Sequence, residues 1–481
     1  MNRKNFVLVL LCVSILVPAR SFSQGLKYLT YDKDQTPSSE HKERRERFMH
    51  DIGADAVAVF FSATEKSRNG DNGYPFRQDD NFYYLTGFNE ENAILVLNPK
   101  GVVLRDERDS TKSDTVREIL FVQPRDPSME RWTGRRFGPE GAVALLGVQR
   151  AYTNEQFKKM FNSVFPYWGA KTVYIAAFPE TGGELMELLQ PVRECVDNLK
   201  SYNLTTELRD PSAIIKKYRV IKSPAEISLM TKAAHISAVA HRQAMMSCKP
   251  GMTEYGIQAV YEYVFRRMGS EYNAYSCIVG AAENSVILHY ESNRRPINDG
   301  DIVLADCGCE YHDYASDVTR TYPANGKFSP AQRKIYQLVL DAQSACIAMM
   351  KPGTAWKDVN TTADSVLLNG LLSLGIVKEK NQHELRRFFP HGLGHAVGLD
   401  VHDVNAGMMV PGMVYTVEPG IYIPENADGV DPKFYNIGVR IEDDILITPE
   451  GHTNLSGEAP REIDEIESLM QKKGIGDAPI E

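Results

Sequence analysis

The sequence predicts an α/β (α+β) protein with two domains, an N-terminal α/β domain and a C-terminal domain with an internal duplication. Two observations support this prediction. Short β-rich runs alternate with helical patterns in the first half of the chain, whereas the second half repeats one order of helix, helix and strand. The length of 481 residues is enough for about two or three domains.

The composition is that of a folded globular protein. Hydrophobic residues make up 43% of the chain and charged residues 24%, which is close to the globular average. The net charge of -9 provides no basic surface for nucleic acid, so we expect no nucleic-acid partner. The seven cysteines are too few for a disulfide scaffold in a chain of this length, and we expect mainly buried free thiols.

The first 23 residues have the layout of a secretory signal peptide. Arg3 and Lys4 precede a 12-residue, mostly apolar run from Phe6 to Val17, and small residues follow at positions 21–23. The apolar run is too short to cross a bilayer comfortably. We therefore expect cleavage before Gln24, export to the periplasm or the medium, and no stable membrane anchor; a retained anchor is the alternative.

Residues 24–212 are expected to form the N-terminal α/β domain. Four runs have the length and composition of strands and are bounded by polar residues, glycine or proline. Helical patterns are found at Glu155–Phe165 and Gly183–Val192. The four expected strands are Ala56–Phe61, Ala93–Leu97, Ile119–Val122 and Thr172–Ile175.

Residues 219–456 are expected to form the second domain, followed by an acidic tail at 457–481. The domain opens with a capping box, because Ser223 precedes a proline and is followed three residues later by Glu226. This pattern predicts a helix to about Met246. The same pattern at Ser329–Gln332 predicts a second long helix to Met350.

The repeat continues beyond these two helices. Each runs into Lys-Pro-Gly and then into a second helical pattern. Farther along, both halves contain a glycine, five residues, an acid, one residue and a glycine, and the acids are Asp306 and Glu418. His289 and His391 each lie 38 residues after the glycine of Lys-Pro-Gly. Four shared features in one order favour duplication over coincidence among common caps and glycines.

Four acids in apolar surroundings indicate a metal site. Asp306, Glu418 and Glu442 follow apolar strand patterns, and Asp317 lies in the segment Ala315–Arg320, next to Val318. Buried carboxylates are costly unless they are paired. Arg320 and Arg440 are alternative partners for individual acids, but two arginines do not balance four acids.

The imidazole ligands are expected in the stretch 389–404. His391, His395 and His402 are spaced by four and seven residues among glycines. The chain lacks a His-Glu-x-x-His motif here, which excludes the helical mononuclear zinc site. Oxygen-rich ligation with one or two imidazoles favours a pair of divalent ions, Mn2+ first, with Co2+ or Zn2+ as alternatives.

These acids and the central histidine resemble the five-ligand set of the pita-bread metallopeptidases. The family includes methionine aminopeptidase, prolidase and aminopeptidase P, and its fold is a pseudo-twofold duplication. The segments Tyr74–Glu90 and Trp132–Arg136 resemble the N-terminal domain of aminopeptidase P, which methionine aminopeptidases lack. The resemblance extends from about Arg44 to Leu469. The ligands that it implies are Asp306, Asp317, His395, Glu418 and Glu442.

The resemblance also implies roles for individual residues. Asp317 and Glu442 would bridge two metal ions, Asp306 would complete one of them, and His395 with Glu418 would complete the other. Glu418 is also a candidate proton carrier. Arg440 is placed on the same strand face as Glu442, where it would orient a ligand carboxylate. The implied catalytic residues are His289, His391, His402 and Glu418, and the implied substrate-binding residues are His289, His402, Tyr422 and Arg440.

The activity implied is that of an Xaa-Pro aminopeptidase, which removes an N-terminal residue that precedes proline in a peptide. Two alternatives remain open at this point. A prolidase would use the same metals on dipeptides only, and a peptide-binding scaffold of the same fold would have lost its ligands. Relatives in the family also imply a homo-oligomer, either a dimer or a tetramer.

Overall fold

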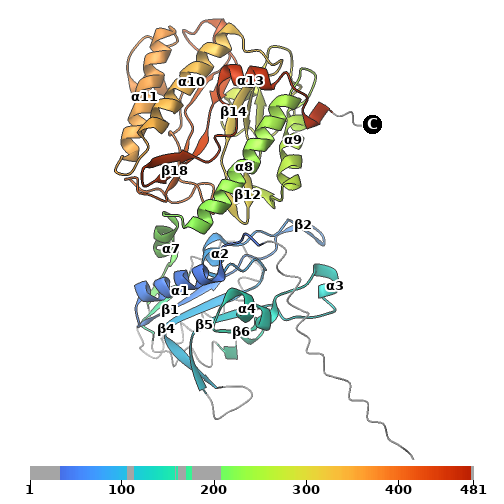
Figure 1. The fold of residues 1–481 in the computed structure, drawn as a ribbon, viewed down its shortest axis with the longest axis vertical. Helices are drawn as coiled ribbons and strands as arrows, with labels where there is room; N and C mark the ends of the chain where they lie inside the picture. The colour runs from blue at the N-terminus through green and yellow to red at the C-terminus, as the bar shows by residue number, and fades with distance from the viewer. Residues whose placement is uncertain (1–32, 106–112, 158, 161–169, 176–206, 478–481) are drawn as a thin grey trace, which may run out of the picture.

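The computed structural model describes residues 33–105, 113–157, 159–160, 170–175 and 207–477. Figure 1 shows two bodies stacked along the long axis, joined where α7 (Ser212–Arg219) meets α8 (Pro224–Ser247). The expected signal peptide and the helix expected at Gly183–Val192 lie outside the described residues. Of the helix expected at Glu155–Phe165, the described positions 156, 157, 159 and 160 are helical.

The N-terminal body is built on a six-stranded mixed sheet in the order β6-β5-β4-β1-β7-β8. Strands β1 and β7 pair in parallel, whereas β1 with β4 and β4 with β5 are antiparallel. All four predicted strands are found, and β4 and β5 are longer than expected because they form one extended hairpin. The strands are β1 (Ala56–Phe61), β4 (Ile94–Arg105), β5 (Ser113–Val122), β6 (Arg150–Thr153), β7 (Thr172–Ile175) and β8 (Glu207–Arg209).

The sheet is apolar on both faces and is covered by helices. The buried residues of β1 alternate between two core clusters, one containing Ala58 and Phe60 and the other Val57 and Val59. Such alternation follows from the two-residue period of a strand. The remaining elements of this body are α1 (Ser38–Ile52), β2 (Ser67–Asn69), β3 (Asn72–Gly73), α2 (Asp80–Thr86), α3 (Glu130–Thr133) and α4 (Gly138–Leu146).

Both predicted capping boxes are confirmed in the C-terminal body. Ser223 accepts a hydrogen bond from the backbone of Glu226 at 3.2 Å, and Glu226 accepts one from the backbone of Ser223 at 2.8 Å. Ser329 and Gln332 make the same reciprocal pair at the start of α10 (Pro330–Met349). Each box satisfies backbone donors that a helix start otherwise leaves without partners.

The repeated order is also found in the structure. Helix α8 packs on α9 (Glu254–Arg267), and α10 packs on α11 (Trp356–Ser373). Figure 1 shows the two helix pairs on opposite sides of the upper body, with the strands between them. Each pair is followed by a three-stranded sheet, namely β10 (Ile278–Ala281), β11 (Ile302–Asp306) and β14 (Thr319–Pro323), then β15 (Val414–Val417), β18 (Asp443–Thr448) and β19 (Gly451–Asn454).

Shorter elements complete this body. Strands β16 (Gly420–Ile423) and β17 (Ile437–Arg440) form a hairpin between the two halves. A small sheet joins β9 (Tyr272–Asn273), β12 (Cys309–Tyr311) and β13 (Tyr314–Ala315). The other elements are α12 (Gln382–Arg386), the 3-10 turns η3 (Ala282–Val286), η4 (Pro432–Phe434) and η5 (Ile475–Asp477), and α13 (Ile463–Leu469).

The segment expected to be an acidic tail differs from that expectation. Helix α13 buries Ile463, Ile466 and Leu469 in the main core. The expectation of a tail rested on the acidic residues of this segment. The apolar residues between them recur at three-residue spacing, so they form one face of a helix. The C-terminal segment is therefore part of the folded domain as far as it is described.

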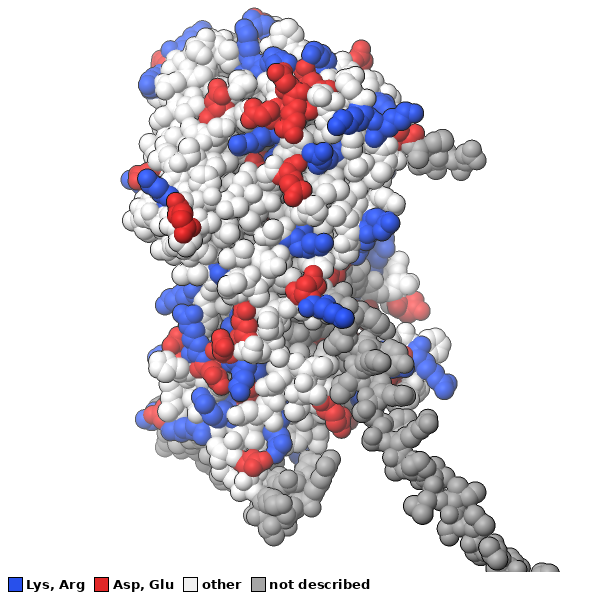
Figure 2. All heavy atoms as spheres, in the orientation of Figure 1, with Lys and Arg blue, Asp and Glu red and all other residues white. Residues whose placement is uncertain are grey.

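Two further expectations concern cysteines and membranes. The five cysteines within the described ranges are buried and free, as expected. No helix in the described part of the chain is long and apolar enough to cross a membrane. On the face shown in Figure 2, lysines and arginines alternate with acidic residues over the described surface, without forming a continuous basic field.

Candidate metal centre and active site

A cavity of about 640 Å3 in the C-terminal body contains nearly all the residues that the sequence singled out. Its lining includes the five expected metal ligands, the three expected catalytic histidines and Arg440. Tyr422 is the exception, since it lies behind the wall and contacts two lining residues, His391 and Arg440. The structure thus brings together residues that are up to 153 positions apart in the chain.

Strand ends bring the acids to the cavity. Asp306 is the last residue of β11, and Glu418 directly follows β15. Glu442 comes two residues after the end of β17, and Asp317 lies between β13 and β14. The loop that carries His395 is bound to the strand that leads to Glu418, because the carbonyl of His395 accepts a hydrogen bond from the backbone of Thr416 at 2.8 Å.

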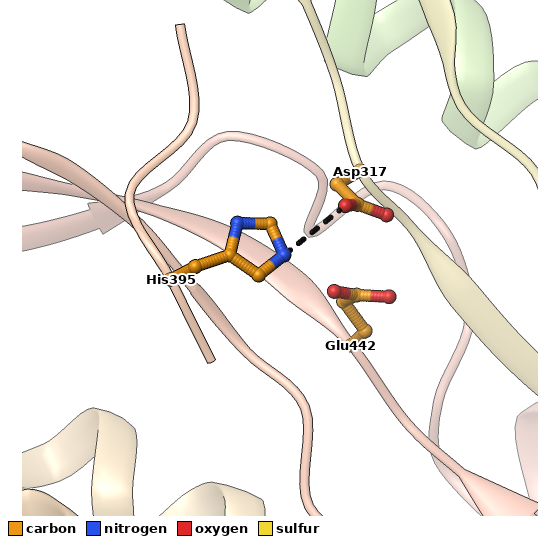
Figure 3. A group of neighbouring side chains, drawn as sticks. All are labelled: Asp317, His395 and Glu442. Carbon is orange, nitrogen blue, oxygen red and sulfur yellow. Dashed lines mark ion pairs between the residues drawn. The ribbon is translucent and has the colours of Figure 1, made fainter. Parts of the chain in front are cut away.

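Three ligand types meet at the centre of this cavity. One potential ligand atom from each of Asp317, His395 and Glu442 lies within 4.8 Å of the others. Figure 3 shows the three side chains pointing toward one another from separate segments. The Nε2 atom of His395 is 3.5 Å from Oδ2 of Asp317 and 3.5 Å from Oε1 of Glu418.

Asp306 is oriented by two donors. The hydroxyl of Tyr275 donates to Oδ1 at 2.5 Å, and Nη2 of Arg440 donates to Oδ2 at 2.7 Å. Arg440 also donates through Nη1 to the hydroxyl of Tyr422 at 2.9 Å. The expected role of Arg440 in orienting a carboxylate therefore has a direct geometric counterpart, although the carboxylate is Asp306.

The carboxyl groups lack compensating charge. Burial, followed by repulsion from Asp306, raises the pKa of Asp317 to about 7. Burial also raises the pKa values of Glu418 and Glu442 well above their ordinary range, and Asp317 repels both. Arg440 is the only lysine or arginine among the lining residues, and a single guanidinium does not neutralise the group. Divalent cations fit this donor set, since hard cations prefer oxygen ligands.

The histidines differ in their protonation and in their partners. Burial lowers the pKa of His395 to about 4, so its ring is neutral at pH 7. Its Nδ1 donates to the carbonyl of Ala396 at 3.1 Å, because a carbonyl oxygen only accepts. This fixes the tautomer and leaves Nε2, with its lone pair, facing the acids. A neutral imidazole in this tautomer is the form that binds metal ions.

His391 is held on both sides of its ring. Burial, reinforced by Arg440, lowers its pKa to about 4. Its Nδ1 donates to the carbonyl of Gly392 at 2.7 Å, and its Nε2 accepts from the hydroxyl of Tyr422 at 2.8 Å. The rings of His289 and His402, in contrast, have no hydrogen-bond partner within the described residues, so their nitrogens are available to a ligand.

Comparison with known proteins identifies the family of the chain. The sequence matches the metallopeptidase family M24 over residues 228–449 and the N-terminal domain of aminopeptidase P over residues 41–174. It is 41% identical to an Xaa-Pro aminopeptidase of Haemophilus influenzae over 445 residues, which cover 90% of this chain and 97% of the relative. The chain belongs to the aminopeptidase P family.

Solved structures of this family have the same fold as the chain. Aminopeptidase P from Escherichia coli superposes with a TM-score of 0.81 at 37% identity, covering 91% of this chain and 99% of the other. Aminopeptidase PepP from Pseudomonas aeruginosa superposes with a TM-score of 0.82 at 35% identity, and the match again covers 91% of this chain and 99% of the other. The predicted fold, an N-terminal α/β domain followed by a pita-bread domain, is confirmed. One Escherichia coli structure is described as zinc-substituted and in complex with product.

Two contacts of this aminopeptidase P family member were missed from the sequence. Tyr275 lies in the connection between β9 and β10, where no repeat or strand pattern marks it. Thr319 donates from its hydroxyl to Oε2 of Glu442 at 2.6 Å. Because Thr319 follows Asp317 by two residues, the sequence shows that it lies near this acid. The sequence does not show its contact with Glu442, which is 123 positions away.

Proposed function

We propose that the chain is a dinuclear metal-dependent aminopeptidase that hydrolyses the bond between an N-terminal residue and a following proline. The observation that carries this proposal is the convergence of buried, mutually repelling carboxyl groups and a neutral imidazole in one cavity. Membership of the aminopeptidase P family supports the same conclusion, since its curated relatives are described as Xaa-Pro aminopeptidases.

The proposed ligands are the five residues expected from the sequence. Asp317 and Glu442 would bridge the two ions, and each offers a carboxylate oxygen within 4.8 Å of a ring nitrogen of His395. Asp306 is assigned to one ion, and His395 with Glu418 to the other. When bound, the ions supply Lewis acidity that activates water and polarises the scissile carbonyl. We propose Mn2+ as the native ion, with Zn2+ and Co2+ as alternatives, to be decided by metal analysis of protein purified without chelators.

Proton transfer is assigned to Glu418. Its carboxylate lines the cavity beside His395, so it is placed to accept a proton from the attacking water and hold it within the cavity. It can then deliver the proton to the proline nitrogen, which leaves as a secondary amine. Any peptide nitrogen must gain a proton to leave as an amine, so the proline nitrogen also needs a proton donor in the cavity.

The histidines have different assignments. His289 and His402 are proposed to donate to the substrate, since their rings are otherwise unpartnered. His391 is proposed to shape the proline side, because both of its nitrogens are engaged and neither is free to stabilise an oxyanion. Tyr422 supports it from behind the wall and is itself bound by Arg440, which lines the cavity.

The charges of the cavity favour the aminopeptidase over a prolidase. A dipeptide places its terminal carboxylate next to the reacting bond, and that charge needs a cation other than the metal ions that the five ligands would hold. The only lining arginine, Arg440, already binds Asp306, and the described lining adds two more acids, Glu291 and Asp400. A longer peptide places a neutral amide in this position and avoids the repulsion.

The decisive experiment compares kcat/KM for Gly-Pro-Ala, Gly-Pro and Gly-Ala-Ala. We expect Gly-Pro-Ala to be the best substrate. A tenfold preference for Gly-Pro, which corresponds to about 1.4 kcal/mol, would replace this proposal with a prolidase. Equal kcat/KM values for Gly-Pro-Ala and Gly-Ala-Ala would show that the enzyme is not specific for proline.

Three further proposals concern the whole chain. We propose cleavage of residues 1–23 with export of the mature protein, an N-terminal domain at 24–212, a second domain that begins at 219 and includes α13, and a dimer or tetramer in solution. Mass spectrometry of native material should give an N-terminus at Gln24. Light scattering on the purified protein should give two or four times the mass of one chain.

A further inference from the structure

The part of the cavity wall that carries His402 is a loop, and positively charged side chains bind it at both ends, at Leu399 and at Asp403. At one end, Nη2 of Arg77 donates to the carbonyl of Leu399 at 2.7 Å. At the other end, Asp403 pairs with Arg219 at 3.1 Å and with Lys222 at 3.5 Å. The residues between these two contacts, at positions 400–402, line the cavity.

Arg77 belongs to the other body of the molecule. It lies just before α2 of the N-terminal domain and, besides the carbonyl of its neighbour Gln78, reaches three further groups at once. Its Nε donates to Glu310 in β12 at 2.7 Å, and its Nη1 donates to Asp80 at 2.8 Å. The guanidinium is a planar fork with five donors, so it can hold three acceptors in a fixed relation, which a lysine ammonium does not.

These contacts continue as a chain of alternating acids and bases. Asp80 also pairs with Arg219 at 3.3 Å, and Arg219 leads on to Asp403. The side chains of Arg219 and Asp403 are 5% and 2% exposed. Charge pairs at such depth are weakly screened by salt, and removal of one member leaves its partner uncompensated. The N-terminal domain and the linker therefore hold the loop through partly buried charges.

Little else fixes the direction of His402. Its ring has no hydrogen-bond partner within the described residues, and its nearest aromatic contact is His395, at 4.0 Å between ring centroids. Within the loop, the backbone of Asp403 donates to the carbonyl of Ala396 at 2.8 Å. The position of the imidazole consequently follows the position of the loop backbone.

We infer that Arg77 is a positioning residue, which sets the loop at Leu399 and thereby holds His402 toward the substrate. This inference rests on the proposed function, because it uses the contact between His402 and a peptide. Catalysis is sensitive to such placement, since a displacement of about 1 Å can cost about 100-fold in rate. The N-terminal domain thus contributes to the reaction without lining the cavity.

The test variant is Arg77→Lys in the full-length, metal-loaded protein. Lysine keeps a positive charge near Glu310 and Asp80 but loses the donor to Leu399. We expect kcat for Gly-Pro-Ala to fall about tenfold, with KM changed less than threefold and with unchanged metal content. Hydrogen exchange followed by mass spectrometry should be faster in peptides covering residues 396–405.

The matched control is Tyr272→Phe. The hydroxyl of Tyr272 donates to the carbonyl of Phe76 at 2.6 Å, so this variant removes a hydrogen bond between the two bodies next to Arg77 without touching the loop. We expect wild-type kcat and wild-type exchange. Equal losses in both variants would show a general effect of the domain contact and would overturn the inference.

A double-mutant cycle gives the sharpest readout. In a His402→Ala background, Arg77→Lys should lower kcat less than twofold, because the group that it positions is absent. A tenfold loss in both backgrounds, or unchanged loop exchange, would overturn the inference. If Arg77→Lys does not fold, Arg219→Lys repeats the cycle from the other end of the loop. A wild-type chain that cleaves no Xaa-Pro peptide overturns the proposed function, and the exchange comparison alone then decides the role of Arg77.

Discussion

Replacing Asp317 with asparagine should stabilise the metal-free protein relative to the wild type, by an amount that increases with pH. The carboxyl of Asp317 is almost fully buried beside three other acids, whereas an asparagine amide carries no charge at any pH. The same substitution should remove most of the stabilisation that added Mn2+ gives, because Asp317 is proposed to bridge both ions.

The magnitude follows from the pKa of this one group. Burial, with repulsion from Asp306, raises the pKa of Asp317 from 3.8 to about 7. A carboxyl with a raised pKa binds more protons in the folded state, so its stabilising contribution is full below 3.8 and is lost as the pH rises toward 7. At about 1.36 kcal/mol per pKa unit, the complete loss is about 4 kcal/mol, and about 2.6 kcal/mol of it falls between pH 5 and pH 8.

The assay is urea unfolding of chelated wild type and Asp317→Asn at several values between pH 5 and pH 8. The difference between the two proteins is the informative quantity. His391 and His395 have pKa values lowered to about 4, and they stabilise the fold more as the pH rises toward 6.5, which opposes the effect of Asp317 in the wild-type curve and cancels in the difference. A difference that stays flat, or that shrinks as the pH rises, would refute the raised pKa.

Three other predictions follow from the site and the repeat. His402→Ala should keep the metal content, measured by elemental analysis, and lower kcat by about 10²–10⁴, the range for losing an acid–base or oxyanion group. Tyr275→Phe removes one of the two donors to Asp306 and should weaken metal binding by about 10–100-fold in a competition titration; unchanged affinity would exclude Tyr275 as a support of this ligand. Ser223→Ala and Ser329→Ala should each lower the free energy of unfolding by about 1 kcal/mol in urea titrations, and a neutral effect at both sites would contradict the energetic value of the capping boxes.

Much of the site could be read from the sequence because it depends on local patterns. A capping box extends over four residues, and the acids Asp306 and Glu418 follow strands that are recognisable as short apolar runs. The repeat then placed one acid at the end of a strand in each half, and the resemblance to the pita-bread metallopeptidases grouped the two acids in one ligand set. The grouping of Asp317, His395 and Glu442 in the structure agrees with the set expected from the resemblance.

The contacts missed from the sequence share a different property. Tyr275 binds Asp306 from a connection without regular structure, and Arg77 binds the carbonyl of Leu399 across 322 positions. Such pairs have no period and no fixed spacing, so only the folded chain brings them together. The buried face of α13 was overlooked for another reason, since acidic residues surround its apolar positions.

The chain of charges from Glu310 to Asp403 restricts how this protein can be recombined. Its two bodies are separate in the chain, yet a catalytic body produced alone would leave Glu310 without Arg77, and Arg219, the partner of Asp403, without Asp80. A chimaera between relatives would need to carry the segment around α2 together with the loop at 398–404. If the two domains were exchanged at the linker alone, the loop with His402 would come from one parent and Arg77 from the other. The contact between Arg77 and the loop would then join two sequences that did not evolve together.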